Sequence, residues 1–229
     1  MPARVVGVVF LATALLATAT GDSSAARSKR PSRWRTSRYG RQGAEIWLEA
    51  PRLGLATAKG YRNGARLYGN KVDDFDLLPG WGFGFGLMFA LYDQFAVEFR
   101  YVQTSHDVAN RDKRWDLDQM FAGARYVFFH DKQYQVFVGA GGVRQTLELD
   151  STEFFLANFE RLSGYGWYST AGLDYVASSR WVVSLRADYV LMKYDHVLAG
   201  TDEKEIEVPF DGSSFGTSIS FNYRIPIWW

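Results

Sequence analysis

Three histidines, with serine and acidic residues near them, are the side chains that could support acyl transfer or hydrolysis in this chain. His106 stands between Ser105 and Asp107, and His196 follows Asp195. A serine nucleophile needs a histidine base, which a carboxylate in turn orients. Because consecutive residues of an extended segment point to opposite faces, Ser105, His106 and Asp107 are not expected to form one relay. No catalytic residue is predicted, and an enzyme stays an alternative.

The chain also lacks the residue patterns of cysteine and metal chemistry. It has no cysteine, which excludes a disulfide scaffold, a zinc–thiolate site and a cysteine nucleophile. The third histidine, His130, is far from the others in sequence, so no metal-ligand spacing forms. The acids between Asp195 and Asp211 could hold divalent cations, although a solvated acidic loop is the simpler interpretation. No metal or cofactor is predicted, and a formal net charge of +1 predicts no nucleic-acid partner.

The amino terminus has the pattern of an export signal. Residues 5–19 read VVGVVFLATALLATA and follow the single cation Arg4. This run is shorter than the roughly 20 residues of a membrane-spanning helix, and it matches the apolar core of a signal peptide. Small residues favour cleavage after Ala19 or after Ala26. Residues 1–26 are therefore predicted to be a signal peptide, and a buried core helix is the alternative.

A basic segment follows the signal peptide. Residues 27–43 carry seven cations and no acid: Arg27, Lys29, Arg30, Arg33, Arg35, Arg38 and Arg41. The rest of the chain is acidic, with 18 basic and 24 acidic residues from 42 to 229. A lysine or arginine near anionic lipid contributes about 1 kcal/mol. We expect a periplasmic tail that contacts anionic lipid, with a plain solvated linker as the alternative.

The segment of residues 80–92 gives the strongest strand signal. One parity carries large apolar residues, namely Trp81, Phe83, Phe85, Leu87, Phe89 and Leu91. The other parity is mostly glycine. Since alternate residues of a strand face opposite sides, one face is bulky and apolar and the other is small. A small inner face is typical of a narrow barrel whose lumen is filled by side chains of neighbouring strands.

Eight such segments predict an all-β fold, an eight-stranded antiparallel up-and-down transmembrane β-barrel over residues 44–229. The expected strands are 44–57, 80–92, 95–102, 120–128, 134–149, 167–175, 183–189 and 215–229. Short connections alternate with long ones at 58–79, 105–114, 150–166 and 193–212, which is the plan of outer-membrane barrels. The facing of the first strand around Pro51 is left open. Gly139, Gly141 and Gly142 predict a bulge that swaps the facing of the fifth strand.

Charged residues recur on the inward parity of these strands. They are Glu98, Arg100, Arg125, Asp174, Arg186 and Asp188. A lone charge in a dry lumen is costly, so these groups must be paired or hydrated. Three acids and three arginines can balance. We expect a closed ionic plug, and a polar gate or small pore is the alternative.

The chain ends on an apolar parity, which comprises Phe221, Tyr223, Ile225, Ile227 and Trp229. This ending, FNYRIPIWW, resembles the signal read by the barrel-assembly machinery of the outer membrane, with a terminal Trp in place of the usual Phe. The segments FAVEFRYV (95–102), AGLDYV (171–176) and LRADYV (185–190) resemble strands of small eight-stranded outer-membrane barrels of the OmpX-like and opacity-protein-like kind.

This resemblance implies the barrel fold and a bacterial outer-membrane location, and it says little about activity. The expected role is non-enzymatic, either structural or through contacts of the long external loops. The expected partners are outer-membrane lipid and lipopolysaccharide, the assembly machinery and an extracellular partner of the loops. A lipid-A-modifying enzyme and a small pore are the alternatives. A soluble carrier would need an apolar lumen and a polar exterior, the reverse of the pattern at residues 81–91.

Overall fold

A computed structural model describes most of the chain beyond the amino-terminal region. The described residues are 43–57, 59–60, 66–67, 70–71, 77–91, 94–108, 114–130, 133–148, 159–199 and 202–226. The predicted signal peptide, the cations of the basic tail, Ile227 and Trp229 lie outside these residues.

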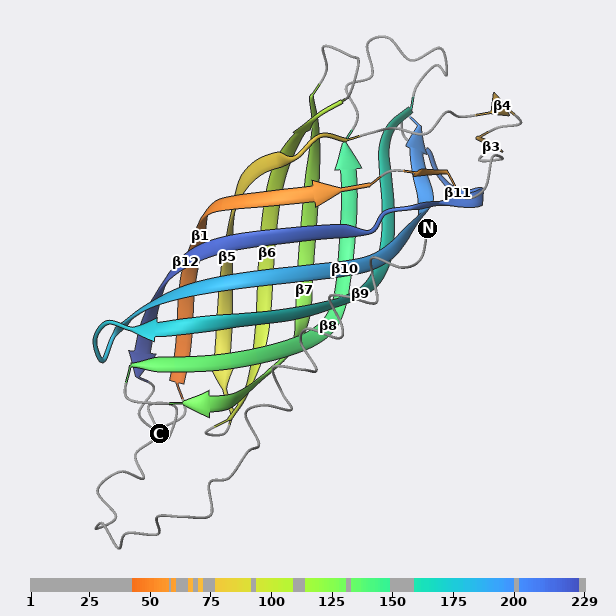
Figure 1. The fold of residues 1–229 in the computed structure, drawn as a ribbon. Helices are drawn as coiled ribbons and strands as arrows, with labels where there is room; N and C mark the ends of the chain where they lie inside the picture. Colours follow the sequence, from red (N-terminus) through yellow and green to blue (C-terminus); the bar gives the residue numbers. More distant parts are fainter. Residues whose placement is uncertain are drawn as a thin grey trace, which may run out of the picture. The chain divides into compact units, whose positions relative to one another are not determined.

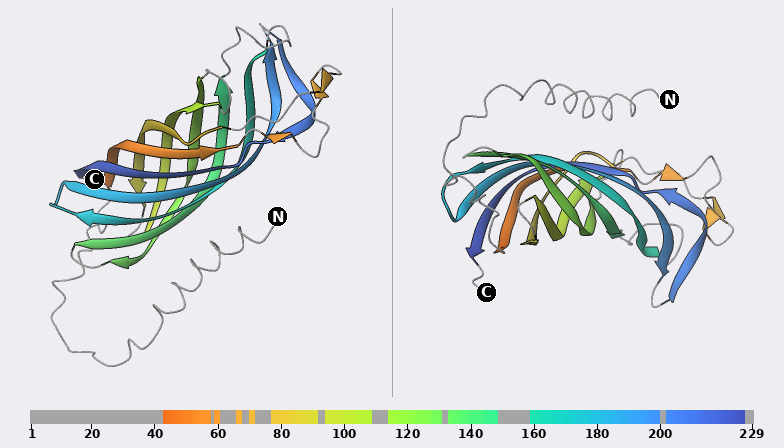
Figure 2. Two further views of the ribbon diagram at one scale, coloured as in Figure 1. Left: turned by 45° about the horizontal axis from the view of Figure 1, so that its top comes forward. Right: turned by 90° about the horizontal axis from the view of Figure 1, so that it is seen from below.

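Eight strands form a closed antiparallel barrel (Figure 1). They are β1 (Gly43–Ala56), β5 (Gly80–Ala90), β6 (Phe95–Asp107), β7 (Arg114–His130), β8 (Tyr134–Glu148), β9 (Phe159–Val176), β10 (Trp181–Ala199) and β12 (Ser214–Pro226). Consecutive barrel strands pair with one another, and β12 pairs with both β1 and β10, so the sheet closes on itself (Figure 2). The predicted fold class is confirmed.

Several strands are longer than the sequence predicted. The third long loop was expected at residues 150–166, but β9 already begins at Phe159, and the expected loop at 193–212 is largely strand. There β10 runs to Ala199 and pairs with β11 (Asp202–Asp211), which in turn pairs with the short β2 (Lys59–Gly60). A second short hairpin joins β3 (Arg66–Leu67) to β4 (Asn70–Lys71). We call β9, β10, β11 and β2 beyond the barrel the rim sheet; it projects from the end of the barrel that carries the long connections (Figure 1).

The predicted bulge in β8 is wrong. This strand pairs with β9 in unbroken register, and its inward parity runs unchanged through Gly139 and Gly141. These glycines are needed for close approach instead, because a Cβ on Gly141 would lie 2.2 Å from the Ala122 carbonyl oxygen of β7. Register shifts occur elsewhere, between Glu49 and Arg52 in β1 and within residues 127–129 of β7. The glycines of this strand allow two backbones to pack closely, and they do not accompany a bulge.

Large side chains fill the space that inward glycines leave. A Cβ on Gly86 would lie 2.3 Å from the Trp47 ring of β1. A Cβ on Gly172 would lie equally close, at 2.3 Å, to the Phe137 ring of β8. The sequence predicted that side chains of neighbouring strands fill the lumen, and these two pairs of residues do so. Each pair joins one bulky residue to one residue without a side chain, so the narrow lumen closes without crowding.

The outer wall of the barrel is apolar. Phe85 and Phe99 are 55% and 49% exposed, and Leu185 is 57% exposed. The inner side carries the charged side chains instead, so the usual burial pattern of a globular protein is inverted. No helix in the described part of the chain is both long and apolar enough to cross a membrane. An apolar exterior around a charged interior is suited to a lipid environment.

Candidate functional site

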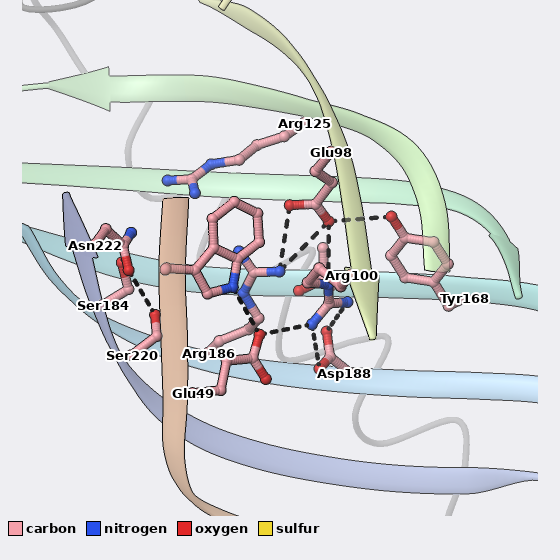
Figure 3. A network of polar contacts seen from close by, with 12 residues as sticks. Glu49, Glu98, Arg100, Arg125, Tyr168, Ser184, Arg186, Asp188, Ser220 and Asn222 are labelled. Carbon is pink, nitrogen blue, oxygen red and sulfur yellow. Dashed lines mark hydrogen bonds and ion pairs between the residues drawn. The ribbon is translucent and has the colours of Figure 1, made fainter. Parts of the chain in front are cut away.

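Arg100 lies at the centre of an ion-pair network inside the barrel (Figure 3). Its guanidinium, from β6, donates two hydrogen bonds across the lumen to Asp188 of β10, at 3.0 and 2.9 Å. It also donates to Glu49 Oε1 of β1 at 3.3 Å. Arg52, also of β1, donates to the same two carboxylates, at 2.8 Å to Asp188 and 3.1 Å to Glu49. Three strands are thereby joined by charged groups that are almost fully buried.

Glu98 forms the second part of this network. Its carboxylate accepts hydrogen bonds from Arg186 Nη1 of β10, at 3.2 and 3.4 Å. The Tyr168 hydroxyl of β9 donates to it at 3.0 Å. The Arg186 guanidinium also lies over the Trp47 ring, 5.3 Å from its centroid. Figure 3 shows Glu98 between Tyr168 and Arg186, so that β6, β9 and β10 are linked through one carboxylate.

A third ion pair lies nearer the short-turn end of the barrel. Arg125 of β7 pairs with Asp174 of β9, and both side chains are buried. The Ser184 hydroxyl donates to the same carboxylate at 2.6 Å, and Asn222 of β12 donates to Ser184 at 3.0 Å. The Arg125 guanidinium also lies 3.4 Å from the centroid of the Phe137 ring, a close cation–π contact. All six charged residues expected on the inward parity thus lie within the lumen and bind other lumen groups.

Sequence reasoning missed four further lumen charges. Glu45, Glu49, Arg52 and Arg224 are also buried, and Arg224 pairs with Glu45 across the contact of β12 with β1. Glu45 and Glu49 share a parity with Trp47, and this was an available signal for an inward face. Arg52 was hidden because the register shift after Glu49 reverses the parity that simple counting gives.

The buried charges of the described lumen balance. There are five carboxylates (Glu45, Glu49, Glu98, Asp174, Asp188) and five guanidinium groups (Arg52, Arg100, Arg125, Arg186, Arg224). Transfer of a single ion into such a site costs several kcal/mol, which only close partners and hydrogen bonds can offset. The observed contacts supply those partners. These ten charged groups can therefore be buried only together. The loss of any one of them leaves an opposite charge in excess.

The lumen becomes neutral and then apolar toward the long connections. Gln119 Nε2 donates to Gln145 Oε1 at 2.6 Å, and Gln145 Nε2 donates to the Tyr194 hydroxyl at 2.6 Å. Beyond this layer, buried apolar side chains such as Trp115 and Leu162 form one cluster. The ionic network, the amide layer and the apolar cluster thus follow one another along the barrel axis.

The histidines form no catalytic relay among the described residues. His106 is buried on the inner face, with Nδ1 at 2.9 Å from the Leu78 carbonyl oxygen and Nε2 at 2.9 Å from Thr104 Oγ1. Ser105 faces outward and bonds to Asp116. His196 Nδ1 lies 2.7 Å from the adjacent Asp195, and His130 is the last residue of β7. No cluster of three metal-ligating side chains occurs in the described ranges.

The expected assembly signal is only partly within the described residues. Phe221 and Ile225 of β12 are 51% and 41% exposed on the outer wall, and Tyr223 of the same parity is half-buried. The Tyr223 ring packs against Trp181 with the centroids 5.0 Å apart. These contacts place aromatic side chains at the short-turn end, as interfacial girdles do.

No protein-family model and no curated protein matches this chain. Solved structures of small outer-membrane barrels do match. The outer membrane protein OprG from Pseudomonas aeruginosa aligns over 82% of this chain and 99% of its own, at 16% identity and a TM-score of 0.51. The outer membrane protein AlkL, solved in DMPC lipid bilayers, aligns over 82% of this chain and 92% of its own, at 13% identity and a TM-score of 0.58. At such identities the likeness concerns the fold.

The fold, the apolar outer wall and the buried charges all fit a barrel that lies in a lipid environment. The closed antiparallel barrel is the architecture of those solved structures, and the resemblance stated from the strand motifs is confirmed. An exterior of exposed Phe, Leu and Trp side chains requires hydrocarbon around it. The chain has the fold of the small eight-stranded β-barrels of the bacterial outer membrane.

Proposed function

We propose that this protein is a non-enzymatic envelope barrel with a closed lumen, which reinforces the membrane and contacts partners through its long connections. The long connections face outward in this proposal, and both ends of the chain lie on the periplasmic side. The rim sheet supports a surface role, because hydrogen-bonded strands hold this part of the long connections in place beyond the barrel. The cations of the basic tail are proposed to contact anionic phospholipid of the inner leaflet.

The ionic network is the observation that carries the closed-lumen proposal. Arg100, Asp188 and Glu49 connect β6, β10 and β1 directly across the interior, and Glu98 with Arg186 adds a second crossing. In an eight-stranded barrel the interior is barely wide enough for side chains. A hydrated pore would need water beside these groups, whereas they are almost fully buried against one another. A conducting state would require this balanced set to separate.

Planar-bilayer recording tests the closed lumen. The full chain, processed and reconstituted, is expected to give little steady conductance. The matched control is Arg114→Ala, which removes an arginine from an exposed pair with Asp107 outside the network and is expected to record like the wild type. A large, stable, ohmic conductance of the wild-type protein would reject the plug and favour a small pore.

A lipid-A mass spectrum tests the non-enzymatic proposal. Lipid A is compared between cells with and without the expressed protein, and His106→Gln serves as the matched variant. Both ring nitrogens of His106 already contact a backbone carbonyl or a hydroxyl, so no change in acylation is expected. A gain or loss of an acyl chain that disappears in the His106 variant would establish a lipid-A-modifying enzyme instead.

A further inference from the structure

A groove lies on the outer wall of the barrel where β7 and β8 meet. It encloses about 610 Å³, and its lining includes Met120 and Tyr165 with the backbone of the strands between them. Ala122 and Gly142 form its floor and pair directly across the two strands. Because those strands keep their register here, the groove is not a gap in the barrel wall. It is a depression in the lipid-facing surface.

Missing side-chain volume creates this depression. Phe99, Ala122, Gly142 and Trp167 lie side by side across four neighbouring strands, so the two smallest residues stand between two large ones. A Cβ added at Gly142 would meet nothing nearer than the Gly166 carbonyl oxygen at 4.0 Å. The space above Gly142 is therefore open. Filling it by substitution would not disturb the strand beneath.

An exposed arginine stands at the end of the groove nearer the long connections. Arg144 pairs with Met120 on one side and Tyr165 on the other, and its guanidinium carbon lies 5.8 Å from the centroid of the Tyr165 ring. No carboxylate of the described residues forms an ion pair with it. Asp118, on the same outward parity as Met120, instead accepts a hydrogen bond from the Tyr101 hydroxyl at 2.7 Å. Among the described residues, Arg144 thus presents a guanidinium without a carboxylate partner beside an apolar groove.

Arg144 lies where the outer wall changes from apolar to polar. Toward the short turns its neighbours are Ala122, Gly142 and Trp167. Toward the long connections the outward residues of β7, β8 and β9 are Asp116, Asp118, Thr146, Glu148, Arg161 and Ser163. This level is therefore the boundary between hydrocarbon and headgroups. A cation held at that boundary faces the phosphates of the adjacent leaflet.

We propose that this groove is a binding site for lipid A of lipopolysaccharide, with an acyl chain over Ala122 and Gly142 and a lipid phosphate on Arg144. A guanidinium binds phosphate through paired, charge-assisted hydrogen bonds. Lipid tails are as apolar as leucine side chains, so the groove selects by shape while the arginine supplies the attraction. Lipid A is the anionic lipid of the outer leaflet. Its assignment rests on the proposed topology, in which the long connections face outward.

Native mass spectrometry of the full processed chain, released from nanodiscs, tests the site. The nanodiscs contain neutral phosphatidylcholine with a small fraction of either lipid A or phosphatidylglycerol. One retained lipid A per barrel is expected for the wild type, with weaker retention of phosphatidylglycerol. Arg144→Gln is expected to lower lipid A retention about tenfold or more, the effect of losing a charged hydrogen bond. Gly142→Leu, which fills the groove, is expected to lower it as well, with Gly142→Val as the milder alternative.

Two substitutions serve as matched controls. Ala171→Leu places the same leucine side chain at an exposed position of β9 outside the groove, and Arg180→Gln removes an exposed arginine near the short turns. Both are expected to retain lipid A like the wild type, and circular dichroism confirms that each variant has folded. Equal retention by all variants would overturn the proposal. Equal retention of phosphatidylglycerol and lipid A would overturn the assignment to lipopolysaccharide.

Discussion

Arg100 of β6 and Asp188 of β10 are joined across the lumen by two parallel hydrogen bonds, Nη1 to Oδ2 at 3.0 Å and Nη2 to Oδ1 at 2.9 Å. Arg52 donates to the same Oδ2 at 2.8 Å. One carboxylate therefore accepts hydrogen bonds from two guanidinium groups in a space with almost no solvent access. Loss of the Asp188 charge would therefore affect two buried arginines at once.

Asp188→Asn tests this dependence. The substitution keeps the shape of the side chain and removes its charge, so two arginines stay buried with one anion fewer. Loss of one partner of a buried pair costs about 3–5 kcal/mol, and the free energy of unfolding in urea, measured in lipid vesicles, is expected to fall by that order. Asp107→Asn removes an exposed partner of Arg114 and is expected to cost no more than about 1 kcal/mol. Equal losses would mean that burial does not govern the network.

The pair of Arg125 and Asp174 tests charge balance. Arg125→Met leaves the Asp174 carboxylate with its Ser184 hydrogen bond but without its main counter-charge. The double variant Arg125→Met/Asp174→Leu removes both charges and is expected to lose less unfolding free energy than Arg125→Met alone. Urea unfolding of the two variants and the wild type completes the comparison. A double variant less stable than the single one would show that the charges act independently.

The facing of the outer wall is tested at Leu185, in the exposed apolar band of β10. Leu185→Arg is expected to lower the free energy of insertion and folding by roughly 2–4 kcal/mol, because a charge near the midplane loses its hydration. Leu185→Met is the control, since it changes shape without adding charge. A substitution of the inward-facing Gly84 cannot serve as a second control, because a Cβ there would lie 2.8 Å from the Tyr101 carbonyl oxygen. If the Arg variant folds like the Met variant, Leu185 does not face lipid.

Trp47 and Gly86 form a complementary pair that a double-mutant cycle can measure. Gly86→Ala is expected to destabilise the barrel, because its Cβ would lie 2.3 Å from the Trp47 ring. Trp47→Ala removes a buried ring and is expected to cost about 3–5 kcal/mol. In the double variant the new methyl group no longer meets the ring, and only the Phe99 carbonyl oxygen, at 2.9 Å, stays close. The combined loss should therefore be smaller than the sum of the two single losses. Strict additivity would show that the two residues do not share this space.

His106 is expected to make stability depend on pH. It lies on β6 beyond the outward apolar band, and burial is the main cause that lowers the pKa of His106 below its ordinary value of 6.5, while the Leu78 carbonyl, Asp116 and Asp107 act in the opposite direction. The folded protein therefore binds this proton less readily than the unfolded chain. Its contribution to stability is full above pH 6.5 and is lost as the pH falls from 6.5 toward the lowered value.

The comparison of His106→Gln with the wild type isolates this contribution. Urea unfolding is measured at several pH values from about 8 down to about 5, the range over which histidine changes its charge. The wild type is expected to lose stability below pH 6.5, and the variant is expected to lose less over the same range. Parallel losses in the two proteins would assign the pH dependence to other groups.

Alternation of residue types predicted the barrel because it reports directly which face each residue occupies. In β6 the pattern from Phe95 to Val102 gives the observed facing at every position, including inward Glu98 and Arg100. Alternation no longer predicts the facing of a residue where the register of a strand shifts. In β1 the two residues between Glu49 and Arg52 oppose a single residue on each neighbouring strand, and no residue count reveals such a shift.

The ends of the strands could not be predicted for a different reason. Outside the hydrocarbon region both faces of a strand are hydrated or meet other loops, so alternation is no longer required. The extension of β10 to Ala199 and the pairing with β11 depend on hydrogen bonds between backbones, which leave little trace in composition. Which charges meet across the lumen also depends on relative strand positions. For that reason the parity of Glu98 and Arg186 was readable, but their contact was not.

The register shift of β1 also makes one part of this strand adjustable in length. Removing Pro51 would leave one residue between Glu49 and Arg52, as on the neighbouring strands, and both side chains would keep their facing. Removing Leu48 instead would reverse the facing of the part of β1 on one side of the deletion. The inward residues of that part would then point toward lipid. A gel-shift assay of folding would separate the two deletions. In natural or engineered variants of such a barrel, a single-residue deletion in β1 is therefore expected to be tolerated at the register shift and to prevent folding elsewhere in the strand.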